Sequence, residues 1–215
     1  MANKKQQLEV PSIPSLGFAP EAYERRYFGE INGALNGYFR NLISTLGALF
    51  GIRGGKFLNN PYGAFQSTVD QTAAATNTAY AMTLNTTDYA NGVSVASSSR
   101  ITVADSGIWN LQWSGQFENS DSQDHDVRVW LKINGTVVVG STGFFAVPSS
   151  HGGINGHNIV GWNYFLSLNS NDYVELWWET DSTNISIQAY PASGNYPSTA
   201  SLIATISFVS NLPTI

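Results

Sequence analysis

The sequence predicts a mainly β protein: a β-sandwich preceded by an extended N-terminal arm and an amphipathic helix. Residues 60–215 contain short runs rich in Val, Ile, Thr and aromatic residues, bounded by Gly, Asn, Asp and Ser, which is typical of strands. Residues 23–49 instead place apolar side chains three and four positions apart, the period of a helix face. No repeat of fixed period is present, which argues against a solenoid or a propeller.

Composition narrows the class of protein. Of the 215 residues, 42% are hydrophobic and only 12% are charged, which is enough apolar material for a core and about half the usual share of charge. The net charge of −5 argues against a nucleic-acid partner. No apolar run is long enough to span a membrane, and residues 1–10 lack the apolar core of a secretory signal. The absence of cysteine excludes disulfides, thiolate metal sites and thiol nucleophiles.

Charge divides the chain into two regions. Residues 1–56 carry seven basic and four acidic residues, whereas residues 57–215 carry three basic and eleven acidic ones. We therefore expect two regions with different roles, an attachment element over 1–56 and a β domain over 57–215. The first region begins as an extended arm, because proline fixes φ and disfavours a helix before it, and three prolines punctuate it: Pro11, Pro14 and Pro20.

A helix is predicted from Pro20-Glu21 to about Leu49. Proline suits a first helical turn, and early acidic residues suit the positive end of the helix dipole. One apolar seam follows, to which we assign the attachment contacts: Tyr23, Tyr27, Phe28, Ile31, Leu35, Tyr38, Phe39 and Leu42. The alternative is an ordinary amphipathic helix packed against its own domain.

Three glycines spaced four apart line one face of the predicted helix: Gly29, Gly33 and Gly37. Each costs about 1 kcal/mol relative to alanine in a helix. Either another backbone approaches this face closely, or the helix is weak and is stabilised by a partner.

Eleven short strands are predicted in the second region, with no helix between them, which favours a sandwich or a barrel. Residues 127–133 alternate apolar and other side chains, and Asn134-Gly135 after them is a strong hairpin signal. The expected strands are 62–67, 80–84, 92–95, 100–103, 108–118, 127–133, 136–139, 158–168, 173–179, 185–189 and 202–209.

Two segments of the β region carry a more specific pattern. Residues 107–113 read Gly-x-aromatic-x-hydrophobic-x-aromatic, after an Ile-Thr-Val strand and an acidic turn at Asp105. Residues 168–176 read Leu-x-x-Asn-Asp-x-Val-x-Leu, with Asn171 where the pattern has glycine. In this order the segments resemble the complement C1q and tumour-necrosis-factor-like jelly rolls over residues 61–209. The resemblance implies a homotrimer with a closed core of two sheets.

The N-terminal region resembles a narrower group. Residues 19–27 read Ala-Pro-Glu-Ala-Tyr-x-x-x-Tyr before a helix rich in Phe and Leu, which is similar to virion proteins of tailed bacteriophages that carry such a jelly roll. This resemblance implies a virion localisation and other virion proteins as partners. The composition and the motifs give no reason to expect a nucleic-acid, membrane or cofactor partner. No collagen-like stalk is present, and the cysteines of some animal relatives are absent, which argues against a signalling role.

Metal binding is not favoured by any cluster. His151 and His157 flank a glycine-rich loop without the further ligands that zinc needs. Asp121, Asp124 and Asp126 around His125 offer oxygen ligands for calcium, but the segment lacks the pattern of a calcium-binding loop, and a solvated loop is the preferred interpretation.

Catalysis is not favoured either. Glu175 and Glu179 share one face of a strand, about 13 Å apart, which is too far for the paired carboxylates of a glycosidase. No nucleophile elbow, phosphate loop or dinucleotide fingerprint occurs. We therefore expect a protein that is not an enzyme and that uses no metal and no cofactor.

The six tryptophans all fall on predicted strands. Trp177 and Trp178 are adjacent, so they must point to opposite faces of their strand, and one of them leaves the core. We expect that side chain at a trimer interface rather than on a platform for carbohydrate stacking.

Three functions remain open at this point. The first is a capsid cement or decoration protein with a trimeric knob. The second is a tail fibre, spike or adhesin component that contacts the host surface, and the third is a lectin-like jelly roll that binds a ligand. The short attachment region and the lack of a fibrous shaft favour the first.

Overall fold

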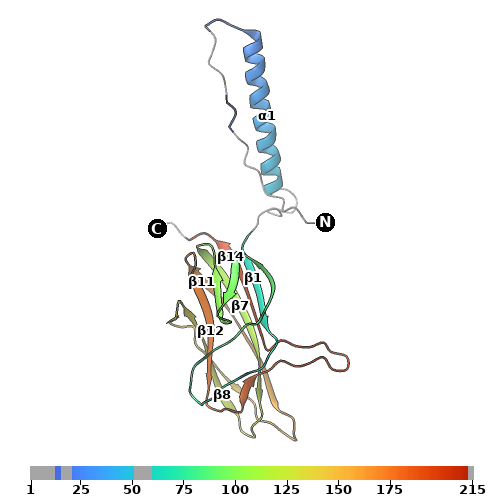
Figure 1. The fold of residues 1–215 in the computed structure, drawn as a ribbon, viewed down its shortest axis with the longest axis vertical. Helices are drawn as coiled ribbons and strands as arrows, with labels where there is room; N and C mark the ends of the chain where they lie inside the picture. Colours follow the sequence, from blue (N-terminus) through green and yellow to red (C-terminus); the bar gives the residue numbers. More distant parts are fainter. Residues whose placement is uncertain (1–12, 16–20, 51–59, 213–215) are drawn as a thin grey trace. The chain divides into compact units, whose positions relative to one another are not determined.

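The computed structural model describes residues 13–15, 21–50 and 60–212, and it divides the chain into two compact units, Met1–Asn59 and Asn60–Ile215. Each unit is considered by itself (Figure 1). Most of the predicted arm and the predicted junction at residues 56–57 lie outside the described residues. No described helix is long and apolar enough to cross a membrane.

The first unit contains one helix, α1 (Arg25–Phe50). The predicted start at Pro20-Glu21 is wrong, because the helix begins several residues later. The backbone carbonyl of Glu24 accepts the first helical hydrogen bond from the Phe28 N–H, at 3.2 Å, so Glu24 is the N-cap residue. The residues before it, Glu21 and Ala22, form a bend.

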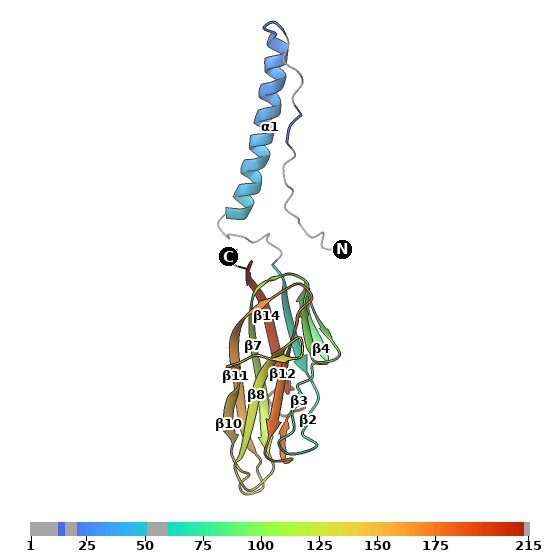
Figure 2. The same ribbon diagram turned by 90° about the vertical axis from the view of Figure 1, so that its left-hand side faces the viewer.

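The second unit consists of two antiparallel sheets (Figures 1 and 2). The first, here named the β7 sheet, has the order β2 (Gln71–Thr72), β13 (Ile185–Ile187), β7 (Gly107–Asn119), β14 (Leu202–Ser210), β1 (Tyr62–Ser67) and β4 (Thr86–Asn91), with β11 (Gly156–Leu168) along the other edge of β7. The second, the β8 sheet, has the order β10 (Gly143–Val147), β8 (His125–Ile133), β12 (Tyr173–Thr180), β6 (Arg100–Val103) and β5 (Val93–Ala96), with β3 (Tyr80–Ala81) on β12 and β9 (Thr136–Val137) on β8.

One core lies between the sheets, and the alternation of side chains along strands such as β7 supplies much of it. On β7 the odd-numbered positions are buried, including Trp109, Leu111 and Trp113, while the even-numbered positions face outward. On β12 the inward side chains include Val174, Leu176 and Trp178. The prediction of a mainly β protein with one helix is confirmed, and the two antiparallel sheets are consistent with a jelly-roll-like sandwich.

The predicted hairpin at Asn134-Gly135 is present, and its geometry explains the choice of residues. Both residues have positive φ, 50° and 79°, as a tight hairpin turn requires. The Asn134 side chain also donates to Asp172 Oδ1 at 2.7 Å and accepts from the Tyr173 N–H at 3.0 Å, which fixes this turn to the next strand.

Three strands were not predicted: β2, β4 and β10. In β4 the sequence Thr-Thr-Asp-Tyr-Ala-Asn has no buried side chain, because this strand forms an exposed edge, so it carries no alternating pattern. The predicted strand 80–84 is shorter than expected and ends at Ala81, although Met82 and Leu84 are buried.

Candidate functional site

The residues that we assigned to attachment form a half-buried seam on α1. Ile31, Leu35, Tyr38 and Leu42 are partly buried, and none of the helix side chains that the structure describes is fully buried. Tyr27 is also partly buried. The remaining seam residues are exposed: Tyr23 (79%), Phe28 (45%) and Phe39 (53%). Tyr23 stacks on Phe28, with ring centroids 5.1 Å apart, so the N-terminal end of the seam is an aromatic cluster. The seam is therefore an apolar surface that the described residues of its unit cover only in part.

The glycine face of α1 is open as well. A Cβ atom added at Gly29, Gly33 or Gly37 would meet no atom within 4 Å. Packing among the described residues therefore does not require glycine there.

The two adjacent tryptophans of β12 lie on opposite faces. Trp178 is 1% exposed and belongs to the core. Trp177 points outward, where the Nζ atom of Lys132 lies 3.4 Å from the centre of its ring, and its Nε1 donates to Glu175 Oε2 at 3.4 Å. Trp177 is therefore partly covered by its own chain, so it is not a bare stacking surface.

The outward side of the β8 sheet collects the positive charge of the domain. Its three basic side chains are each paired with an acidic or aromatic neighbour. Arg128 donates to Glu179 Oε1 at 2.8 Å and lies over the Phe144 ring. Arg100 lies over the Tyr173 ring, and its Nε is 3.6 Å from the buried carboxylate of Glu175. The charges on this solvent-facing side are therefore each balanced by a neighbouring carboxylate or aromatic ring.

The outward side of the β7 sheet is different. We name the uncharged face by its outward residues on five adjacent strands: Tyr62, Ala64, Gln66, Tyr89, Ile108, Asn110, Gln112, Ser114, Ile159, Asn163, Phe165, Ile203, Thr205 and Ser207. None of these is charged, and the exposed members include Tyr89 (70%), Ile159 (70%) and Phe165 (65%). Asp88 and Glu118 lie at its margins.

One edge of the uncharged face is also open. Strand β11 pairs along its whole length with β7, and its other edge pairs with no strand among the residues that the structure describes. Its side chains include no Lys, Arg, Asp or Glu, and Trp162 is 46% exposed. Proteins usually protect a long edge strand with charge, proline or a bulge, so an edge of this kind indicates an interface.

The histidines and aspartates considered as metal ligands do not form a metal site. Within residues 13–15, 21–50 and 60–212, no group of three or more such side chains is placed to hold a metal ion. Asp124 accepts from the backbone N–H of Ser149 at 2.7 Å, and the backbone N–H of Asp126 donates to Asp181 Oδ1 at 3.2 Å. The Oγ of Ser149 lies 3.2 Å from His151 Nε2.

His125 instead joins two loops at the end of the sandwich. Its Nε2 lies 3.0 Å from Asp121 Oδ2, and its Nδ1 lies 3.1 Å from Asp181 Oδ1. The hydrogen bond with His125, together with one from the Asn184 amide, holds the pKa of the Asp121 carboxyl below its usual value. Both ring nitrogens of His125 are therefore bonded to carboxylates, and these bonds hold the two loops together.

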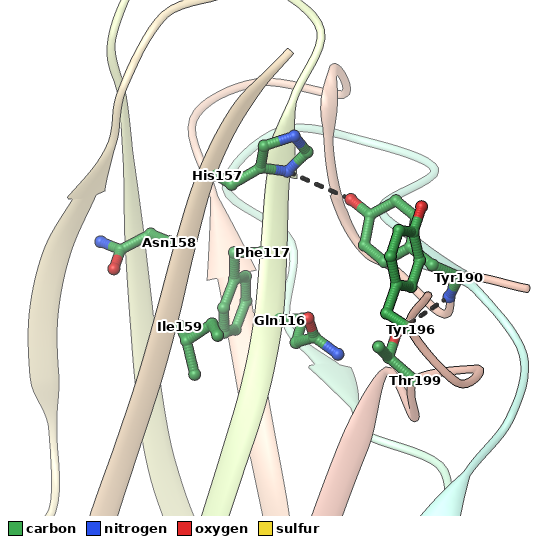
Figure 3. Close-up of a pocket in the computed structure, with 8 residues that line it drawn as sticks. All are labelled: Gln116, Phe117, His157, Asn158, Ile159, Tyr190, Tyr196 and Thr199. Atoms are coloured by element: carbon green, nitrogen blue, oxygen red, sulfur yellow. Dashed lines mark hydrogen bonds between the residues drawn. The ribbon is translucent and has the colours of Figure 1, made fainter. Parts of the chain in front are cut away.

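A shallow pocket of about 240 Å³ lies where a hairpin over residues 190–199 overhangs β7 and β11 (Figure 3). Tyr190 donates to Glu118 Oε2 at 2.5 Å, and its hydroxyl lies 3.1 Å from His157 Nδ1. Burial, and then the bond to Glu118, raise the pKa of Tyr190 well above its usual value. Tyr196, 57% exposed, stands on the same hairpin.

The sequence interpretation missed this pocket, apart from His157. The signal was the repeated Tyr-Pro pair, Tyr190-Pro191 and Tyr196-Pro197, in a segment otherwise made of small residues. Such a segment is expected to form a loop, and its aromatic residues need a surface to pack against.

No family model matches the chain, and no curated protein sequence matches it.

Proposed function

We propose that this protein is a non-enzymatic structural protein of a virion, a capsid cement or decoration protein. Its helix α1 attaches it to the particle, and its β domain forms a trimeric knob. The observation that carries the proposal is the helix: 26 residues long, with an apolar seam and no fully buried side chain among those described. Helices gain most of their stability by packing such a face against a partner.

The arrangement of strands supports a C1q/TNF-like jelly roll. The last strand, β14, lies between the first, β1, and β7, so the sheet closes only through pairs distant in the chain. The assignment rests on this interleaved order together with the sequence patterns at 107–113 and 168–176.

The uncharged face is the surface that we assign to the trimer contacts. It carries exposed aromatic and aliphatic side chains with no charge among them, beside the open edge of β11. Exposed apolar surface of this extent is typical of protein interfaces. The sequence-based assignment of the interface to the outward tryptophan is not favoured by this geometry, since Trp177 already lies under Lys132.

The attachment role is tested in purified particles. The double substitution Ile31→Asp, Leu35→Asp places two charges in the seam, and the expected result is a chain that folds but is lost from particles, measured by mass spectrometry. The control is Asn32→Asp, Asn36→Asp, which adds the same charge at exposed positions of the same turns. Normal incorporation of the seam variant would contradict the proposal.

The same particles separate the capsid from the tail. A cement protein stabilises the shell in proportion to its occupancy, so its loss should lower the temperature at which heads release their genome. A tail fibre or spike is the second candidate, favoured by the exposed pocket at the 190–199 hairpin. In that case head stability stays unchanged and adsorption to host cells falls.

A further inference from the structure

We propose that the pocket under the 190–199 hairpin binds a neutral saccharide, such as the terminal residue of a surface glycan. The site lies within the β domain, and Ile159 at its rim also belongs to the uncharged face, so the pocket borders the proposed trimer contacts. Its walls are the hairpin on one side and the outward faces of β7 and β11 on the other (Figure 3).

The pocket is held in shape by bonds that leave its aromatic surface free. The Tyr190 N–H donates to Thr199 Oγ1 at 3.1 Å, the Thr199 N–H donates to the Tyr190 carbonyl at 2.9 Å, and Ser193 and Tyr196 exchange two backbone bonds. The hairpin is therefore formed before any ligand arrives. Preorganisation of this kind favours binding, since little conformational entropy is lost.

The hydrogen-bonding groups suit hydroxyl groups. Gln116 uses its Nε2 to hold the Ala200 carbonyl at 2.6 Å, while its Oε1 has no partner within the described part of the chain. The Tyr196 hydroxyl and His157 Nε2 are likewise without a partner among the described residues. An acceptor, a hydroxyl and an imidazole nitrogen around aromatic rings match a sugar, whose hydroxyls both donate and accept.

The charge of the pocket selects for a neutral ligand. Among the described residues, Glu118 is the one carboxylate bonded to the pocket lining, and it is already engaged by Tyr190 and by Asn155, the latter at 2.8 Å. Every Lys and Arg of residues 60–212 lies on the opposite sheet. An anionic ligand would therefore meet Glu118 with no Lys or Arg beside it, and only His157, whose Nδ1 lies 3.9 Å from Glu118 Oε2, as a titratable base.

Not every lining residue takes part. Asn158 turns to the other side of β11, where its Nδ2 donates to the Ala146 carbonyl at 2.9 Å (Figure 3). Ile159, 70% exposed, adds an apolar side chain at the rim of the pocket. The saccharide would then lie on Tyr196 and reach Gln116 with its hydroxyls.

The test uses the full-length protein and saturation-transfer NMR with galactose, glucose, N-acetylglucosamine and sialic acid as separate probes. For so small a ligand in an open pocket, the expected dissociation constant of the best neutral sugar is roughly 1 mM. Immobilised glycans ending in the same sugars, presented to the full chain, distinguish a surface glycan from a free sugar.

Tyr196→Ala should weaken that binding by at least about fivefold, because it removes the exposed ring. The control is Phe144→Ala, which removes an exposed aromatic ring (68%, against 57% for Tyr196) from β10, away from the pocket and from the uncharged face, and should leave binding unchanged. Absence of transfer to every neutral probe, equal binding by Tyr196→Ala, or preference for sialic acid would each overturn the proposal.

Discussion

The two outward faces of the sandwich differ in how they treat charge. The β8-sheet face carries all three basic residues of the described domain, each beside an acid or an aromatic ring. The uncharged face on the other sheet has no ionised side chain, yet it exposes Tyr89, Ile159 and Phe165. One face of the sandwich therefore carries paired charges and the other carries none. This difference is expected if the uncharged face forms the proposed interface between copies of the chain.

The largest effect is expected beneath the faces, where β12 supplies an internal comparison. Trp178→Ala should lower the free energy of unfolding by about 3–5 kcal/mol, because it leaves a cavity in the shared core. Trp177→Ala, one residue away on the β8-sheet face, should cost much less. Urea denaturation of both variants measures the difference, and equal losses would contradict the assignment of the two faces.

The next effect separates the faces themselves. Phe165→Asp should dissociate the trimer, because each copy loses a buried phenyl group, about 1.5–3 kcal/mol, and gains a charge in the interface. Phe144→Asp is the matched control, since Phe144 is 68% exposed against 65% for Phe165 but lies on the β8-sheet face. Light scattering of the full-length variants measures the mass. If the unaltered protein is a monomer at micromolar concentration, the trimer is ruled out.

The smallest effect concerns the contact between Lys132 and Trp177 on the β8-sheet face. Lys132→Ala removes the ammonium group above Trp177 and should reduce stability by about 0.5–1 kcal/mol without changing the oligomeric mass. Lys132→Arg should retain most of that stability. A change in mass on Lys132→Ala would show that this face also takes part in assembly, and the contrast between the faces would fail.

The sequence predicts the elements with an internal pattern and misses those defined by distant partners. Strand β7 alternates Trp109, Leu111 and Trp113 with polar residues, so its location and its inner face could both be predicted. Alternation predicts that Trp177 and Trp178 point to opposite faces of the strand. Which of the two is buried depends on where the second sheet packs.

The pocket could not be predicted for the same reason. Tyr190 is bonded to Glu118, 72 residues earlier in the chain, and neither residue has a local pattern that points to the other. Strand β4 is a second example, because it has no buried side chain, and its strand pairing in the described residues is with β1.

The position of β14 has a consequence for how the protein is made. Tyr62, at the start of β1, pairs with Ser207, and β14 is also the strand that joins β1 to β7. During translation, the β7 sheet therefore stays in two pieces until the ribosome has released β14, because contacts so distant in sequence form late. A ribosome that stalls before Leu202 yields a product with two unmatched sheet edges, which chaperones and proteases recognise. Only a chain that includes this strand can close its sandwich, so folding of the β domain waits for β14.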